Sequence, residues 1–249
     1  MSNRQIRAEQ ARQRRRAILV TISVLVVLAI AGVTFKNYWD ARVRAAHSQG
    51  TEVYTPKPDK AAKVAMFIGD STVAGSGATT SSADFTSIIA NTFHWYELNL
   101  SKGGAGYHSG NPTLLEQVAT LKGYKPSYII VSAGRNDGFS PEVQANVYDF
   151  FNQLRKLYPK AKIVVVAPLA TAEPPTGAPS PLPIDQLRNS VRSAAYGVGA
   201  TYLSIGDVLQ AKPQLLATNG YDVNNAGHQA LAEAAIAAMK SNGIYPSHK

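Results

Sequence analysis

Short apolar blocks alternate along most of the chain with longer stretches whose apolar residues recur at helical spacing. The apolar blocks predict five buried strands: Val64–Ile68, Tyr96–Leu100, Tyr128–Ser132, Lys162–Leu169 and Thr201–Ile205. The amphipathic stretches predict the intervening and closing helices: Ala83–Phe93, Leu114–Leu121, Pro141–Leu157, Ile184–Tyr196 and Ala226–Ser241. Continuous apolar strands that alternate with helices are typical of a parallel sheet covered on both faces. The pattern therefore predicts an α/β fold of three layers around a five-stranded parallel sheet.

An uncharged segment precedes this pattern. Residues 17–35, "AILVTISVLVVLAIAGVTF", contain no charged side chain. As a helix they would span roughly 28 Å, close to the hydrocarbon thickness of a bilayer. Six arginines and one glutamate lie before them, in residues 1–16. This asymmetry predicts one transmembrane helix, a signal anchor, with residues 1–16 as a basic cytoplasmic tail and the rest outside the cytoplasm.

The same segment has an alternative interpretation. The small residues of Ala29-Ile30-Ala31 resemble a processing site, so a cleaved signal peptide is the competing prediction. The apolar stretch is long for a signal peptide, which favours the uncleaved anchor. Residues 36–62 are polar, contain "TPKPDK" and predict a juxtamembrane linker, and residues 63–245 are the predicted folded domain.

Charge and composition exclude several classes of function. The formal net charge is +9, but residues 1–16 account for +5 of it through six arginines and Glu9. From Lys36 onward, 19 lysines and arginines face 15 aspartates and glutamates, a net charge of only +4. We therefore expect no nucleic-acid partner for the domain. The chain has no cysteine and no acidic or histidine cluster with metal spacing, so we expect neither a metal nor a cofactor.

Residues suited to acyl transfer follow the first three predicted strands. The first strand runs into Gly69-Asp70-Ser71, the second into the glycine loop "NLSKGGAGY", and the third into "SAGRND". The carboxyl ends of parallel strands share one edge of the sheet, where open α/β folds hold their ligands. A serine hydroxyl can attack an ester carbonyl, and backbone or amide N–H groups can stabilise the resulting oxyanion.

The segments "FIGDST", "NLSKGGAGY" and "AGRND" resemble the first three sequence blocks of the SGNH (GDSL-type) hydrolase family. The resemblance extends over roughly residues 63–240. It implies a flavodoxin-like sheet with strand order 2-1-3-4-5. It also implies that Ser71 is the nucleophile and an oxyanion-hole donor, that Gly104 supplies a second backbone N–H, and that Asn136 supplies a side-chain N–H.

The fourth block departs from the family. Members carry Asp-x-x-His before the last helix, whereas this chain reads "NGYDVNNAGHQAL". Aligned on the Asn-x-x-Gly-His that follows, Asn219 stands at the aspartate position and Asp222 at the histidine position. A serine without a basic partner is a weak nucleophile, and a solvated carboxylate with a pKa near 4 is a weak general base.

The remaining histidines offer other candidates for the base. His228 is the nearest imidazole along the chain and is the candidate catalytic histidine, although a helix residue of the family's Gly-His element is the stronger interpretation. His108, in the glycine loop, is a second candidate. His94 precedes a strand at the opposite edge, and His47 and His248 lie in the linker and the tail.

The sequence thus predicts a membrane-anchored, extracytoplasmic hydrolase of acyl esters. Its location and the resemblance favour an O-acylated glycan or lipid of the envelope as substrate. The principal alternative is a degenerate domain that binds such a ligand without cleaving it. A flavodoxin-like cofactor module is a weaker alternative because no phosphate-binding motif follows Gly69.

Overall fold

The structure is a computed structural model that describes residues 63–137, 140–170 and 184–246. The predicted cytoplasmic tail, membrane anchor and linker, and the proline-rich loop 171–183, lie outside these residues. Within the described part of the chain, no helix is long and apolar enough to cross a membrane.

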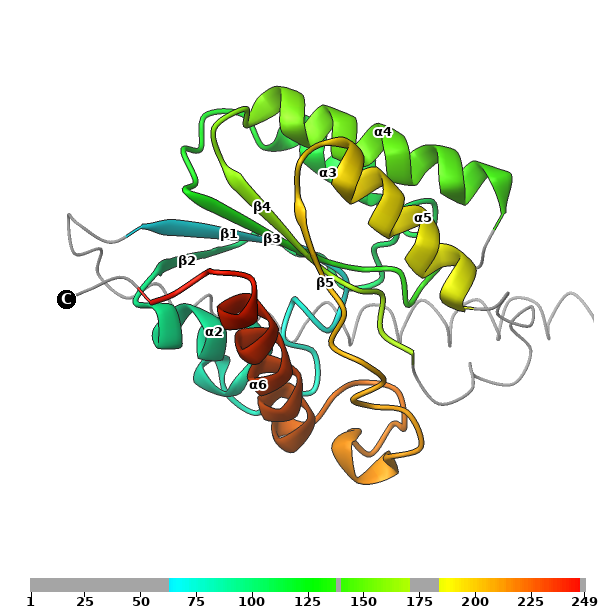
Figure 1. Cartoon of the computed structure of the whole chain (residues 1–249). Helices are drawn as coiled ribbons and strands as arrows, with labels where there is room; N and C mark the ends of the chain where they lie inside the picture. The colour runs from blue at the N-terminus through cyan, green and yellow to red at the C-terminus, as the bar shows by residue number, and fades with distance from the viewer. Residues whose placement is uncertain (1–62, 138–139, 171–183, 247–249) are drawn as a thin grey trace, which may run out of the picture. The chain divides into compact units, whose positions relative to one another are not determined.

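A parallel sheet of five strands forms the middle layer of the domain (Figure 1). The strands are β1 (Val64–Gly69), β2 (Tyr96–Asn99), β3 (Tyr128–Ser132), β4 (Lys162–Val166) and β5 (Thr201–Leu203). Their order across the sheet is β2-β1-β3-β4-β5, and every neighbouring pair is parallel. The predicted α/β class, strand number and strand order are confirmed. The second, fourth and fifth strands end earlier than predicted, at Asn99, Val166 and Leu203.

Helices cover both faces of the sheet (Figure 1). One face carries α3 (Leu114–Thr120), α4 (Pro141–Leu157) and α5 (Ile184–Gly197), and the other carries α2 (Phe85–Phe93) and α6 (Asn225–Ser241). Two short 3-10 helices, η1 (Ser81–Ala83) and η2 (Pro213–Leu215), lie in loops. Each face has its own apolar core, because strand residues point alternately to the two sides: Met66 and Ile68 to one, Ala65 and Phe67 to the other.

Capping residues place two helix starts next to the loops of the candidate site. The Ser140 side chain accepts a hydrogen bond from Val143 N–H, and Pro141 occupies the first turn of α4, where its missing N–H costs nothing. The Asn224 side chain accepts from Gly227 N–H and begins α6 directly after the Asn219–Asp222 segment. Both helices therefore begin at the edge where the strands end.

Candidate active site

Ser71 lies in a tight turn at the carboxyl end of β1. The turn is closed by backbone hydrogen bonds from Ala74 N–H to Asp70 O and from Ser76 N–H to Ser71 O, both 2.9 Å. Gly69 makes this geometry possible, because a Cβ there would lie 2.1 Å from Ser132 O on the adjacent strand. Ser71 is 5% exposed, and its Oγ has no hydrogen-bond partner in the described part of the chain.

The side chain of Asp70 stabilises the same turn through a hydrogen bond. Its Oδ1 accepts a hydrogen bond of 2.9 Å from Thr72 N–H, and its side chain is buried. Burial raises the pKa of Asp70, while the positive charge of Arg135 opposes that effect. Asp70 therefore fixes the backbone beside Ser71.

The glycine loop after β2 lies against the end of β1. Lys102 N–H donates 3.1 Å to Gly69 O, which joins the loop to the residue where β1 ends. Gly104 has φ +78°, in the left-handed region that glycine adopts without strain, and a Cβ there would meet nothing within 4 Å. Asn136, from the loop after β3, donates 2.8 Å from Nδ2 to Ala105 O. The loops after β1, β2 and β3 thus meet, as predicted from their order.

Asp137 fixes the far side of the glycine loop. Its carboxylate accepts hydrogen bonds from the backbone N–H groups of Tyr107 (2.7 Å), His108 (3.0 Å) and Ser109 (2.9 Å). A Cβ at Gly106 would lie 2.5 Å from the Asp137 carboxylate, so the loop can approach only with glycine at that position. Asp137 is a structural residue of the site, a role that its place after Asn136 did not reveal.

Donors without partners remain at this convergence. Among the described residues, the backbone N–H groups of Ser71 and Gly104 have no acceptor, and Asn136 Nδ2 uses one of its two N–H groups on Ala105 O. Such free donors can stabilise a developing oxyanion when they converge on it. The predicted residues Ser71, Gly104 and Asn136 therefore lie on neighbouring loops with donor capacity to spare.

Arg135 connects the serine turn to the segment before α6. Its guanidinium donates 2.8 Å to Thr72 Oγ1 and also donates to Tyr221 O, and it stacks over the Tyr221 ring at 4.3 Å from the ring centroid. The Tyr221 hydroxyl in turn donates 2.8 Å to Asn136 Oδ1. The sequence analysis did not single out Arg135 or Tyr221. Their adjacency to Asn136 and Asp222 was the only available signal.

Asn219 and Asp222 pair with each other. Asn219 Nδ2 donates 2.7 Å to Asp222 Oδ2, and Asn219 Oδ1 accepts from the backbone N–H groups of Tyr221 and Asp222. The segment also packs on the turn after Ser71, since a Cβ at Gly77 would lie 2.3 Å from Val223 O and 3.1 Å from Asp222 Cβ. This segment holds an amide–carboxylate pair where the resemblance implies a carboxylate and an imidazole.

His228 has no free ring nitrogen. Its Nδ1 accepts 3.2 Å from Phe85 N–H, so Nε2 carries the proton and donates 3.1 Å to Ser76 O. The side chain is fully buried, and burial lowers its pKa. These contacts join α6, the start of α2 and the serine turn. The contacts match a structural role for His228 as a helix residue, which the sequence analysis weighed against a catalytic role. They leave no ring nitrogen of His228 for Ser71.

The other described histidines are His108 and His94. His108 is exposed, and its Nδ1 lies 3.1 Å from Asn146 Nδ2 on α4. His94 ends α2 at the opposite edge of the sheet in a left-handed conformation, with φ 54°. His228 and His94 are therefore not placed to act as a base for Ser71, whereas His108 stays a candidate through its Nε2. Within residues 63–137, 140–170 and 184–246, no group of acidic and histidine side chains could hold a metal ion.

A buried polar network lies behind the serine turn, between α2 and β2. Thr86 Oγ1 lies 2.5 Å from Glu97 Oε1 and 2.9 Å from Asp84 Oδ1, and Ser87 Oγ donates 2.7 Å to Glu97 Oε2. Asn99 Nδ2 extends the network by donating to Thr86 Oγ1 and to Val73 O in the serine turn. Burial raises the pKa of Glu97 to about 7.

Comparison with known proteins agrees with this arrangement. A model of the GDSL-like Lipase/Acylhydrolase family matches residues 67–230. No curated protein sequence matches the chain.

Solved structures of esterases share the fold. A carbohydrate esterase family 2 enzyme from Corynascus thermopiles (Myceliophthora fergusii) superposes with a TM-score of 0.55 at 18% identity, over 76% of this chain and 68% of that chain. A catalytic mutant of an acetylxylan esterase from Geobacillus stearothermophilus superposes with a TM-score of 0.55 at 17% identity, over 71% of this chain and 94% of that chain. The psychrotrophic esterase EstA from Pseudoalteromonas superposes with a TM-score of 0.54 at 15% identity, over 72% of this chain and 97% of that chain.

Proposed function

Since the chain belongs to the GDSL-like lipase/acylhydrolase family, we propose that it hydrolyses acyl esters slowly, with Ser71 as the nucleophile. One observation carries this proposal: the buried, unpartnered Ser71 Oγ lies among loops that hold unpartnered N–H donors. A hydroxyl without a partner that lies among unpartnered N–H donors is free to attack an ester bound to those donors.

The reaction proceeds in two steps. Ser71 Oγ attacks the ester carbonyl carbon, and the oxyanion is stabilised by Ser71 N–H, Gly104 N–H and Asn136 Nδ2. Collapse breaks the bond to the alkoxy oxygen, which leaves as the alcohol with the proton that Ser71 released. Water then attacks the acyl-serine ester, which releases the carboxylic acid and restores the serine.

Proton transfer is the weak part of this mechanism. We assign it to Asp222, which stands at the position of the family's histidine and is held by Asn219. A carboxylate is a poor general base for a serine hydroxyl, since its conjugate acid is far stronger than the hydroxyl. Turnover should therefore be low compared with an enzyme that has a serine–histidine pair.

The proposed location is extracytoplasmic. Residues 1–16 would be the cytoplasmic tail, residues 17–35 the membrane anchor, residues 36–62 the linker and residues 63–245 the catalytic domain. The uncharged span and the arginines before it support this arrangement. For the substrate we propose an O-acylated envelope glycan. The supporting observation is that several solved structures with this fold are named as carbohydrate or acetylxylan esterases.

A second function competes with hydrolysis. The domain would bind an acyl ester or acylated glycan without cleaving it, and the observation that favours this is that both ring nitrogens of His228 are engaged by the backbone. Hydrolysis of p-nitrophenyl acetate by the purified chain and by Ser71→Ala separates the two. Slow turnover that Ser71→Ala abolishes supports the hydrolase. A rate equal to that of Ser71→Ala indicates a binding domain.

A further inference from the structure

The amino edge of the sheet, meaning the loops and helix ends that precede the five strands, is rich in lysine. Strands and helices run in opposite directions, so the carboxyl ends of α4 and α6 also lie at this edge. Exposed lysines lie before β1, β3 and β4 and at the carboxyl ends of α4 and α6, but not in the loops that precede β2 and β5. The exposed lysines of this edge are Lys63, Lys122, Lys125, Lys156, Lys160, Lys162 and Lys240.

No exposed carboxylate balances these lysines among the described residues of the amino edge. Glu97, near the start of β2, is buried and faces Thr86 and Ser87 of α2. Exposed acidic residues gather instead at the opposite edge, where Asp207 pairs with Arg188. The charge of the domain is therefore polarised along the strand direction, although its net charge is small.

Exposed tyrosines share the amino edge. Tyr124 is 42% exposed between two of the lysines, Tyr196 is 61% exposed near the end of α5, and Tyr245 is 65% exposed after α6. Tyrosine favours the boundary between water and lipid headgroups, because its ring is apolar and its hydroxyl is polar. Lysines and tyrosines together therefore match the chemistry of a headgroup layer.

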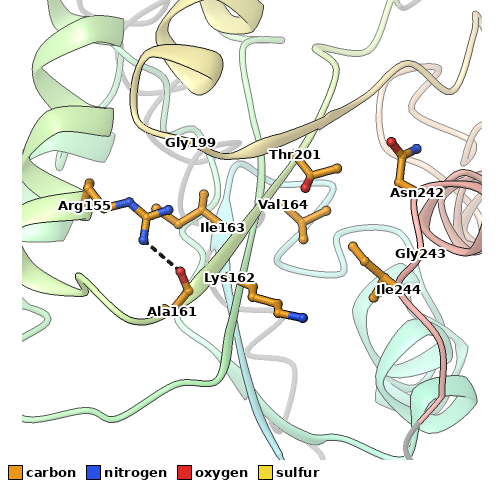
Figure 2. A pocket seen from close by; sticks show the side chains of 10 residues that line it. All are labelled: Arg155, Ala161, Lys162, Ile163, Val164, Gly199, Thr201, Asn242, Gly243 and Ile244. Carbon is orange, nitrogen blue, oxygen red and sulfur yellow. Dashed lines mark hydrogen bonds between the residues drawn. The ribbon is translucent and has the colours of Figure 1, made fainter.

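A hollow of about 290 Å³ opens at the same edge (Figure 2). Lys162, Thr201 and Asn242 are among its polar lining residues. Arg155 also lines the hollow and fixes two of its loops by hydrogen bonds, of 2.8 Å to Ala161 O before β4 and of 2.9 Å to Val198 O before β5. The hollow presents a lysine and polar side chains on a fixed frame, which adds polar contacts to the lysine-rich face.

We propose that the amino edge docks on an anionic phospholipid bilayer. Charge complementarity selects the partner, because a phosphate surface attracts a lysine-rich face that has no exposed carboxylates. The chain enters the described domain at Lys63, so the predicted membrane anchor is joined to this edge. Ser71 lies at the opposite edge and would face away from the bilayer. Docking requires neither ester hydrolysis nor the anchor. Failure of the docking proposal would therefore leave the proposed hydrolysis untouched, and the reverse also holds.

The test uses residues 50–249, which lack the anchor. Residues 49–249 form one compact unit, and both apolar cores lie within it. The protein is sedimented at low salt with vesicles of phosphatidylcholine alone or mixed with phosphatidylglycerol. The double variant Lys122→Glu with Lys160→Glu reverses two amino-edge charges. Lys102→Glu with Lys212→Glu makes the same charge change at the other edge and is the matched control.

We expect binding only to the vesicles that contain phosphatidylglycerol, and loss of binding at high salt. The amino-edge double variant should partition about 10-fold or more less strongly, whereas the control should stay within about twofold of the unmodified protein. Equal losses in the two double variants, or equal binding to both vesicle types, would overturn the proposal. So would release by excess inorganic phosphate at constant ionic strength, since that would indicate a site for free phosphate rather than a docking surface.

Discussion

The phenolic hydroxyl of Tyr221 donates a hydrogen bond of 2.8 Å to Oδ1 of Asn136. Nδ2 of the same amide donates 2.8 Å to Ala105 O, so both ends of the amide are held and one N–H stays free. The Tyr221 ring is itself fixed under the guanidinium of Arg135. Burial raises the pKa of Tyr221, which keeps the hydroxyl protonated and able to donate.

We therefore expect Tyr221 to act as a positioning residue for Asn136. Tyr221→Phe removes only the hydroxyl and keeps the ring under Arg135, and it should lower kcat for p-nitrophenyl acetate by about 3- to 10-fold with little change in KM. In an Asn136→Ala background the same substitution should have no further effect. Additive losses in the double variant would show that Tyr221 acts through something other than Asn136.

Asn136 itself should contribute through its free N–H. Asn136→Ala removes one oxyanion donor and should lower kcat by roughly 10²–10³ while leaving KM nearly unchanged. Asn136→Asp, which keeps the shape but replaces the donor with an acceptor, should be at least as impaired. Steady-state kinetics of the three proteins check this. Activity retained in Asn136→Asp would remove Asn136 from the oxyanion hole.

His228 should matter for stability and not for turnover. His228→Ala leaves a cavity and removes the partners of Phe85 N–H and Ser76 O, which should lower the free energy of unfolding by roughly 2–4 kcal/mol. The rate per folded molecule should stay within about twofold. Urea unfolding and active-site titration measure the two quantities. A loss of several orders of magnitude in kcat, with the fold intact, would make His228 the base.

Sequence reasoning reached the sheet and the residues at its carboxyl edge because both depend on local patterns. Apolar runs gave the five strands, and the parallel order placed Ser71, Gly104 and Asn136 on neighbouring loops. It did not reach the contacts that hold the site, because Arg135, Tyr221 and Asp137 act on partners 28 to 86 positions away in the chain. The environment of His228 was equally hidden, since its ring partners come from the start of α2 and from the serine turn, both distant in the chain.

Glu97 gives the domain a specific pH dependence. The single hydroxyl proton of Thr86 cannot serve both Glu97 and Asp84, so a proton on one of the two carboxyls completes both contacts, and burial favours the protonated form of Glu97. Its pKa is about 7 in the folded protein against an ordinary value of 4.5, so the folded state binds the proton more tightly. The contribution of protonated Glu97 to the free energy of unfolding is therefore complete below pH 4.5 and is lost as the pH rises through 7.

Glu97→Gln should remove this dependence, because the amide can donate to Thr86 and accept from Ser87 without titrating. Between pH 5 and pH 8 the unmodified protein should lose roughly 1–3 kcal/mol relative to Glu97→Gln in urea unfolding. His228, whose pKa burial lowers, changes stability in the opposite direction. It does so in both proteins, so their difference isolates Glu97. A constant difference across this pH range would mean that Glu97 ionises normally.

Restoring the family's residues in the Asn219–Asp222 pair should raise activity. The backbone there is already held at the site, because Arg135 donates to Tyr221 O and Gly77 packs closely against Val223 O. Asn219→Asp with Asp222→His supplies an imidazole to accept the Ser71 proton and a carboxylate to orient it, a pairing that contributes about 10²–10⁴ to turnover. The single variant Asp222→His should gain less, because Asn219 cannot stabilise an imidazolium, and Asn219→Asp alone should gain nothing. Rates for p-nitrophenyl acetate, each compared with a matching Ser71→Ala protein, measure these effects. If the double variant is folded but no faster than the unmodified chain, position 222 does not face Ser71 and the assignment of Asp222 as proton acceptor fails.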